Sequence, residues 1–110
     1  MMLTKKIALF VFVICPILYL STCSYISEKR SAASNIINIG DTRANVISKF
    51  GVRPIREKQG ALSIYAGSTC TEPCYERFWF ENRLSLVGEA WYVELAKDGR
   101  VIDKGRVVSP

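Results

Sequence analysis

The sequence predicts one small α+β domain, in which a short N-terminal helical part packs on a small antiparallel β-sheet that ends in a hairpin. Three segments carry this prediction: a capped helical segment at 42–50, an aromatic-rich strand at 74–82, and a second aromatic strand that leads into a hairpin turn at Asp98–Gly99. The domain is expected to occupy residues 36–110, because the residues before it form an apolar run and then a polar stretch.

The first element is a helix expected over residues 42–50. Asp41 or Thr42 can cap it by accepting hydrogen bonds from free backbone N–H groups. Apolar residues in "NVISKF" recur at the spacing of one helical face. Gly51 stands where a helix C-cap favours a left-handed residue. The apolar face is too short to be stable alone, so the helix must pack on the sheet.

Strands are expected to follow. The segment 61–67 alternates like a strand, although a second short helix is an open alternative. The segment 74–82, "CYERFWFEN", carries aromatic residues on both alternating faces, so we expect a strand that is covered on both sides. We expect Trp79 and Trp91 in the core, the alternative being an exposed tryptophan at a partner-binding surface.

The clearest unit is the C-terminal hairpin. Residues 89–95 form one strand, Asp98–Gly99 is a strong turn signal, and residues 101–108 return as the partner strand. A two-residue turn and a bulged three-residue turn give different registers, and both remain open at this point.

The N-terminus has the layout of a secretory signal. Lys5 and Lys6 precede the uncharged apolar run 7–22. With residues 23–27 added, the run reaches 21 residues, which is enough to cross a bilayer. Cleavage as an ordinary signal and retention as a single-pass inner-membrane anchor are both alternatives to the interpretation that follows.

The stretch "LSTC", which ends at Cys23, resembles a bacterial lipobox. The resemblance implies that residues 1–22 are a signal peptide, that the thiol of Cys23 receives a lipid, and that residues 23–35 form a lipidated flexible tether. Ser24 at the second mature position implies an outer-membrane protein that faces the periplasm. A thioether-linked lipid with two or more chains gives stable anchoring.

Composition excludes several classes of function. The chain has 15 basic and 10 acidic residues, and 13 − 10, or +3, remains without Lys5 and Lys6. This mild charge does not predict nucleic-acid binding. There is no histidine, the usual general base and metal ligand, and no phosphate-binding or nucleophile motif. We expect no enzyme activity, no cofactor and no metal site. Arg53, Arg56 and Lys58 are the candidate contacts for a partner or for lipid.

Cys70 and Cys74 frame the segment "CTEPC". In an oxidising compartment two nearby cysteines most simply form a disulfide. Metal binding or redox exchange by this CxxxC pair, and free thiols, are the alternatives.

The stretch "INIGDTRANVISKFGVRP", with Gly40, Thr42, Val46, Gly51 and Pro54 as its motif positions, resembles the opening helix of the SmpA/OmlA family of small outer-membrane lipoproteins. The stretches "FWF" and "WYVELAKDGRVIDK" resemble that family's aromatic first strand and closing hairpin. The resemblance implies a divergent member that binds an unidentified envelope protein.

We therefore expect a lipid-anchored periplasmic interaction or accessory module, for which the family suggests the outer-membrane assembly machinery as partner. The alternatives are a metal- or redox-handling envelope protein and an inhibitor or immunity-type lipoprotein.

Overall fold

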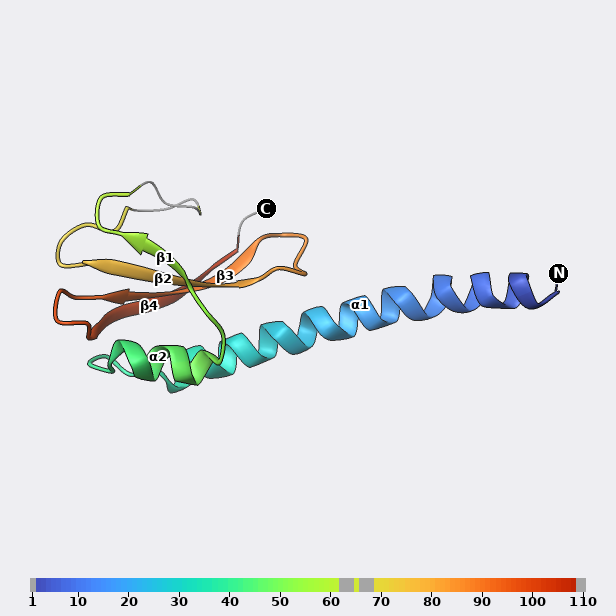
Figure 1. Ribbon diagram of the computed structural model, residues 1–110, viewed down its shortest axis with the longest axis horizontal. Helices are drawn as coiled ribbons and strands as arrows, with labels where there is room; N and C mark the ends of the chain where they lie inside the picture. The colour runs from blue at the N-terminus through green and yellow to red at the C-terminus, as the bar shows by residue number, and fades with distance from the viewer. Residues whose placement is uncertain (1, 62–64, 66–68, 109–110) are drawn as a thin grey trace.

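The computed structural model describes residues 2–61, 65 and 69–108. In these residues two helices lie on one side of a four-stranded antiparallel sheet with the strand order β1-β2-β3-β4 (Figure 1). The elements are α1 (Met2–Ile36), α2 (Arg43–Phe50), β1 (Ile55–Lys58), β2 (Glu76–Asn82), β3 (Glu89–Leu95) and β4 (Val101–Val108). The predicted α+β class, with a helical part packed on an antiparallel sheet that ends in a hairpin, is confirmed.

Helix α2 begins and ends as its sequence predicts. The hydroxyl of Thr42 accepts a hydrogen bond from the backbone N–H of Asn45 at 3.3 Å, so Thr42 is the N-cap. Gly51 has φ of 71° and its N–H donates to the carbonyl of Ile47 at 2.9 Å. Val46 and Phe50 on the inner face are buried against the sheet.

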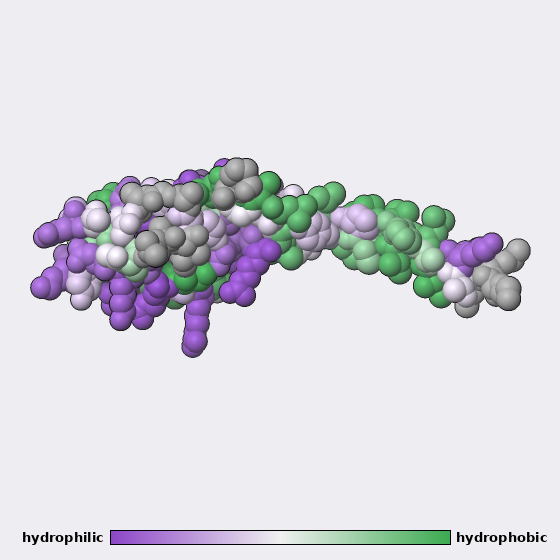
Figure 2. Space-filling view, turned by 90° about the horizontal axis from the view of Figure 1, so that it is seen from above, coloured by the Kyte–Doolittle hydropathy of each residue, from purple (hydrophilic) through white to green (hydrophobic). Residues whose placement is uncertain are grey.

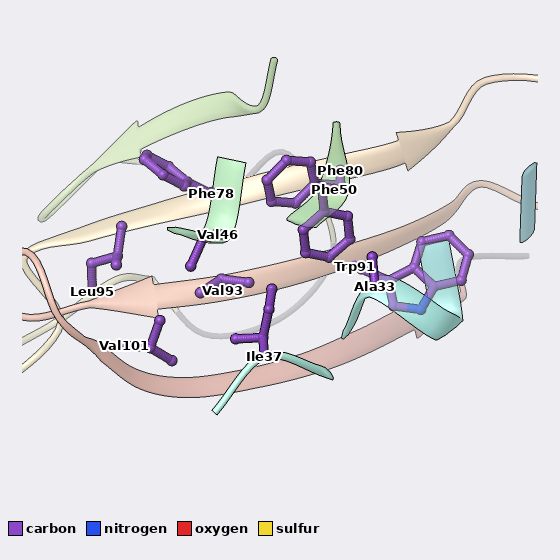
Figure 3. Packing of buried hydrophobic residues seen from close by; sticks show 10 residues of the cluster. All are labelled: Ala33, Ile37, Val46, Phe50, Phe78, Phe80, Trp91, Val93, Leu95 and Val101. Carbon is purple, nitrogen blue, oxygen red and sulfur yellow. The ribbon is translucent and has the colours of Figure 1, made fainter. Parts of the chain in front are cut away.

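The hydrophobic core lies between the helices and the sheet (Figure 3). The rings of Phe50 in α2 and Phe80 in β2 stack with their centroids 3.7 Å apart. Strand β2 is buried along almost its whole length, which confirms the expectation that it is covered on both faces. The cluster comprises Ala33, Ile37, Val46, Phe50, Phe78, Phe80, Trp91, Val93, Leu95 and Val101.

The β3–β4 hairpin adopts the bulged three-residue turn. The N–H of Gly99 donates to the carbonyl of Ala96, the N–H of Ala96 donates to the carbonyl of Arg100, and Gly99 has φ of 79°. This is a type I turn followed by a glycine bulge. A second irregularity follows, because Glu94 pairs with Asp103 whereas the next residue pairs two positions earlier in β4.

The expectation of a flexible tether over residues 23–35 is wrong. These residues are helical, because α1 continues without interruption to Ile36. Ala33 and Ser34 are buried, and the ammonium group of Lys49 donates to the carbonyl of Ile36 at 2.8 Å, which satisfies one free carbonyl at the helix end. The folded unit therefore includes the end of α1 and begins before residue 36. The open alternative at 61–67 falls mostly on residues 62–64 and 66–68, which lie outside the described residues.

Candidate functional site

The N-terminal half of α1 is an exposed apolar stalk. Leu9, Phe10 and Phe12 are 67%, 64% and 80% exposed, and Figure 2 shows the apolar surface extending beyond the polar domain. Over Thr4–Ile36 the helix is long and apolar enough to cross a membrane, and its most apolar window has no residue buried inside the protein. Such a surface fits a signal peptide or a membrane anchor and is consistent with an envelope protein.

Cys23 lies on the side of α1 that faces the sheet. The side-chain amide of Asn82, the last residue of β2, donates to the carbonyl oxygen of Cys23 at 3.1 Å and lies 3.6 Å from its Sγ. One turn before Cys23, the hydroxyl of Tyr19 donates to the carbonyl of Leu84 in the β2–β3 loop. The candidate lipid-attachment residue is therefore beside one end of the sheet. Cys15 is exposed on the apolar stalk.

Glu89 joins α1 to the sheet at this end. Its carboxylate accepts hydrogen bonds from Arg106, Asn82 and Ser27, the last of these in α1. Burial on its own would raise the pKa of Glu89, but the three donors outweigh it and hold the pKa below its ordinary value. Arg106 also stacks its guanidinium over the ring of Trp91 at 5.6 Å, so the ionised carboxylate sits in a fixed network.

A cavity of about 310 Å³ lies between α1, the segment that joins α2 to β1, and β2. Three arginines line it: Arg30 in α1, Arg53 in the segment between α2 and β1, and Arg83 directly after β2. Burial lowers the pKa of Arg30, and its Nε has no hydrogen-bond partner among the residues that the structure describes. Among the described lining residues Glu81 is the carboxylate, and it accepts a hydrogen bond from the hydroxyl of Tyr65. The remaining lining residues are Ile26, Val52, Ile55, Trp79 and Phe80.

This combination suits one kind of ligand. Guanidinium groups bind carboxylates and phosphates through paired N–H donors. The apolar wall fits a ligand or peptide that carries hydrocarbon next to its anionic group.

The predicted basic contacts do not gather at one place. Arg53 lines the cavity, but Arg56 donates from Nη2 to Oε2 of Glu76 at 3.1 Å, and Lys58 is exposed at the end of β1. Arg30 and Arg83 complete the cavity and were not singled out from the sequence. The helical spacing of Arg30 from Cys23 and Ala33 is the signal that would have identified it, once residues 23–35 are recognised as helix.

The opposite face of the sheet carries a buried ion-pair cluster. Arg77 contacts Glu57 at 3.0 Å and Glu94 at 3.2 Å, and the indole N–H of Trp79 donates to Glu57 at 2.8 Å. Trp79 and Trp91 are 3% and 2% exposed, so the expectation that both lie in the core is confirmed. Neither tryptophan is therefore an exposed partner contact.

The sulfur atoms of Cys70 and Cys74 are 2.13 Å apart, at the disulfide distance expected from the sequence, and both residues are buried. The carbonyl of Cys70 accepts from the N–H of Gly60 and that of Cys74 accepts from the side chain of Gln59, both at 2.9 Å, so these two hydrogen bonds join the bridged segment to the residues that follow β1. Within the described part of the chain, no group of three or more His, Cys, Asp or Glu residues is placed to hold a metal ion.

No family model, curated protein or solved structure matches the chain. The resemblance to the SmpA/OmlA family stays a prediction that depends on the helix and hairpin motifs.

Proposed function

We propose that the protein is a lipid-anchored interaction module of the bacterial cell envelope, held by acylated Cys23 to the periplasmic face of the outer membrane. The observation that carries this proposal is the uncovered apolar helix over residues 7–22, which ends at "LSTC" beside a folded domain. Cleavage before Cys23 is compatible with the fold, because every buried residue of the described core lies at Ala33 or later. The mature chain keeps its whole core.

Retention of the helix as a single-pass inner-membrane anchor is the second candidate. It is favoured by the continuity of α1 and by the hydrogen bond from Tyr19 to Leu84, which cleavage would remove. Both candidates fix the domain at a membrane surface, and they differ in whether residues 1–22 persist.

The cavity lined by Arg30, Arg53 and Arg83 supports a role in binding. It suits an acidic segment of an envelope protein or an anionic lipid, and the SmpA/OmlA resemblance suggests the outer-membrane assembly machinery as the partner. The metal or redox alternative receives less support, because the sulfurs of Cys70 and Cys74 are bonded to each other and buried. No contact in the described residues favours the inhibitor or immunity alternative.

The anchoring is tested by intact mass spectrometry of the full chain expressed in a bacterium. The wild type is expected to lack residues 1–22 and to carry a diacylglyceryl increment. Cys23→Ala removes the acceptor thiol, and Cys15→Ala is the matched control, because it changes a second cysteine in the same helix. The control should be processed like the wild type, whereas Cys23→Ala should stay at full-length, unmodified mass. Membrane-bound wild type with an intact, unmodified N-terminus would contradict lipidation and favour the single-pass anchor.

The binding role is tested by affinity purification from detergent-solubilised envelopes. Arg30→Gln and Arg53→Gln alter the cavity, and Arg56→Gln is the matched control, since Arg56 pairs with Glu76 instead. Loss of a co-purifying protein or lipid in the two cavity variants, but not in the control, is the expected result. Equal recovery with all three variants would exclude the cavity as the binding site.

A further inference from the structure

We propose that the β2–β3 loop, residues 83–88, inserts its apolar tip into the same membrane that holds the N-terminal anchor. The loop would then be a second membrane contact that fixes the orientation of the domain. This inference rests on the proposed anchoring, and it goes beyond it because it concerns a segment more than sixty residues away along the chain.

The composition of the loop suits a bilayer surface. Leu86 is 90% exposed and Val87 is 48% exposed at its tip, and the loop contains no acidic residue. Arg83 at its start is exposed, and its long side chain can extend to the lipid phosphates at the membrane surface. The turn at the other end of the sheet differs, because it carries the charged residues Lys97, Asp98 and Arg100.

The loop also points in the direction of the anchor. Figure 1 shows the β2–β3 connection at the end of the sheet toward which the N-terminal half of α1 extends, and the β3–β4 turn at the opposite end. Tyr19 bonds to the loop through the carbonyl of Leu84, and Cys23 is bonded by Asn82, the residue before the loop. The loop therefore lies directly beside the helix at the level of residues 19–23.

The length of the apolar helix sets the depth of that contact. From Ile7 to Tyr19 the helix rises only about 18 Å at 1.5 Å per residue, whereas the hydrocarbon core of a bilayer is about 30 Å thick. A spanning helix that enters at Ile7 therefore leaves the hydrocarbon near Ile26, so the contact between Tyr19 and Leu84 lies on the lipid side of that boundary. If the chain is cleaved instead, the acyl chains begin at Cys23, which Asn82 contacts at 3.1 Å. The loop meets lipid in both cases.

Several backbone polar groups of the loop already have hydrogen-bond partners within the protein. The N–H groups of Leu84, Ser85 and Val87 donate to Asn82 Oδ1 at 3.2 Å, to the Asn82 carbonyl at 3.1 Å and to the Ser85 hydroxyl at 3.4 Å. The carbonyl of Leu84 is satisfied by Tyr19. Backbone groups that already have partners lose less on leaving water, so insertion is not opposed by unpaired amides at these positions.

The test uses the full, uncleaved chain synthesised without cells into lipid nanodiscs, with quenching of tryptophan fluorescence by brominated phospholipid as the readout. Leu86→Trp reports on the loop, Asp98→Trp on the opposite turn and Phe12→Trp on the anchor, and the wild-type signal of Trp79 and Trp91 is subtracted. Leu86→Trp is expected to lose a clearly larger fraction of its fluorescence than Asp98→Trp, because only a tryptophan that lies at or within the bilayer comes close to the brominated acyl chains. Val87→Trp repeats the measurement in case the first variant disturbs the loop.

The anchor probe separates the two proposals. Quenching of Phe12→Trp together with Leu86→Trp or Val87→Trp supports the inserted loop. Quenching of Phe12→Trp alone, with both loop probes equal to Asp98→Trp, overturns the loop contact and leaves the anchoring intact. No quenching at any probe overturns the single-pass anchor and the loop contact together, whereas anchoring through an acylated Cys23 is tested by the intact mass of the processed chain.

Discussion

Substitution of Ala33 by glutamate tests whether the second half of α1 belongs to the folded domain. Ala33 is 7% exposed and lies in the core cluster with Ile37 and Trp91 (Figure 3), whereas its neighbour Ala32 is exposed. Ala33→Glu therefore puts a carboxylate into the core, and Ala32→Glu puts the same group into solvent. The two variants have the same composition and the same charge, which makes Ala32→Glu the matched control.

The difference between them follows from burial. The loss of helix propensity on replacing alanine by glutamate is a few tenths of a kcal/mol in both variants and cancels. At Ala33 the larger side chain overfills a packed site, at a cost of about 1–3 kcal/mol. The carboxyl group also loses hydration without a designed partner, which costs about 1–3 kcal/mol more. At Ala32 an exposed change should stay within about 0.5 kcal/mol. We expect Ala33→Glu to be less stable than Ala32→Glu by about 2–5 kcal/mol.

The assay is urea unfolding of the full chain in nanodiscs, followed by the fluorescence of the buried residues Trp79 and Trp91. A shift of this size is a large fraction of the stability of a small domain. The midpoint should fall clearly for Ala33→Glu and stay near the wild-type value for Ala32→Glu, with a similar denaturant slope. Equal midpoints for the two variants would refute the docking of α1 and restore the flexible tether over residues 23–35.

Three further changes probe the polar contacts. The pKa of Glu89 is lowered in the folded state from its ordinary value of about 4.3. The ionised carboxylate therefore stabilises the fold at neutral pH, and this contribution is lost as the pH falls through the lowered pKa. Glu89→Gln should be less stable than the wild type at pH 7 and should lose less stability between about pH 5 and 3, which unfolding measured across pH will show. Arg77→Leu removes the cation that contacts the buried Glu57 and the half-buried Glu94 and should lower the unfolding free energy by about 3–5 kcal/mol, whereas a neutral effect would show that these ion pairs are dispensable. Replacing Cys70 and Cys74 by alanine opens a short loop and should cost about 2 kcal/mol in the chain-entropy description, with an unchanged urea midpoint as the contrary result.

The parts of the fold that could be predicted from the sequence are those with local signals. Thr42 and Gly51 mark the ends of α2 because capping depends on residues within one turn. The β3–β4 hairpin follows from alternation around Asp98–Gly99, although only the structure distinguishes its turn. Strand β2 was recognised because aromatic residues on both faces need cover on both sides.

The docked half of α1 could not be recognised in this way. Its inner stripe, which includes Cys23, Ser27, Arg30 and Ala33, is small or polar and so lacks the apolar periodicity that identifies a packed helix. The residues that this stripe contacts when it packs on the sheet, such as Glu89, come from strands more than sixty residues later in the chain. The arginine cavity was missed for the same reason, because its three guanidinium groups meet only through the arrangement of helix and sheet.

The positions of these features restrict what kind of partner the protein can have. If the β2–β3 loop and Cys23 lie at the membrane, the cavity lies near it as well, because Ile26 and Arg83 in its lining are each close in sequence to one of those contacts. The disulfide segment lies at the far end of the sheet, beside the end of β1 and the start of β2 (Figure 1). A binding event in the cavity therefore occurs within a short distance of the lipid headgroups. This favours an anionic lipid, or an acidic segment of a protein that is itself held in the membrane, over a freely diffusing ligand.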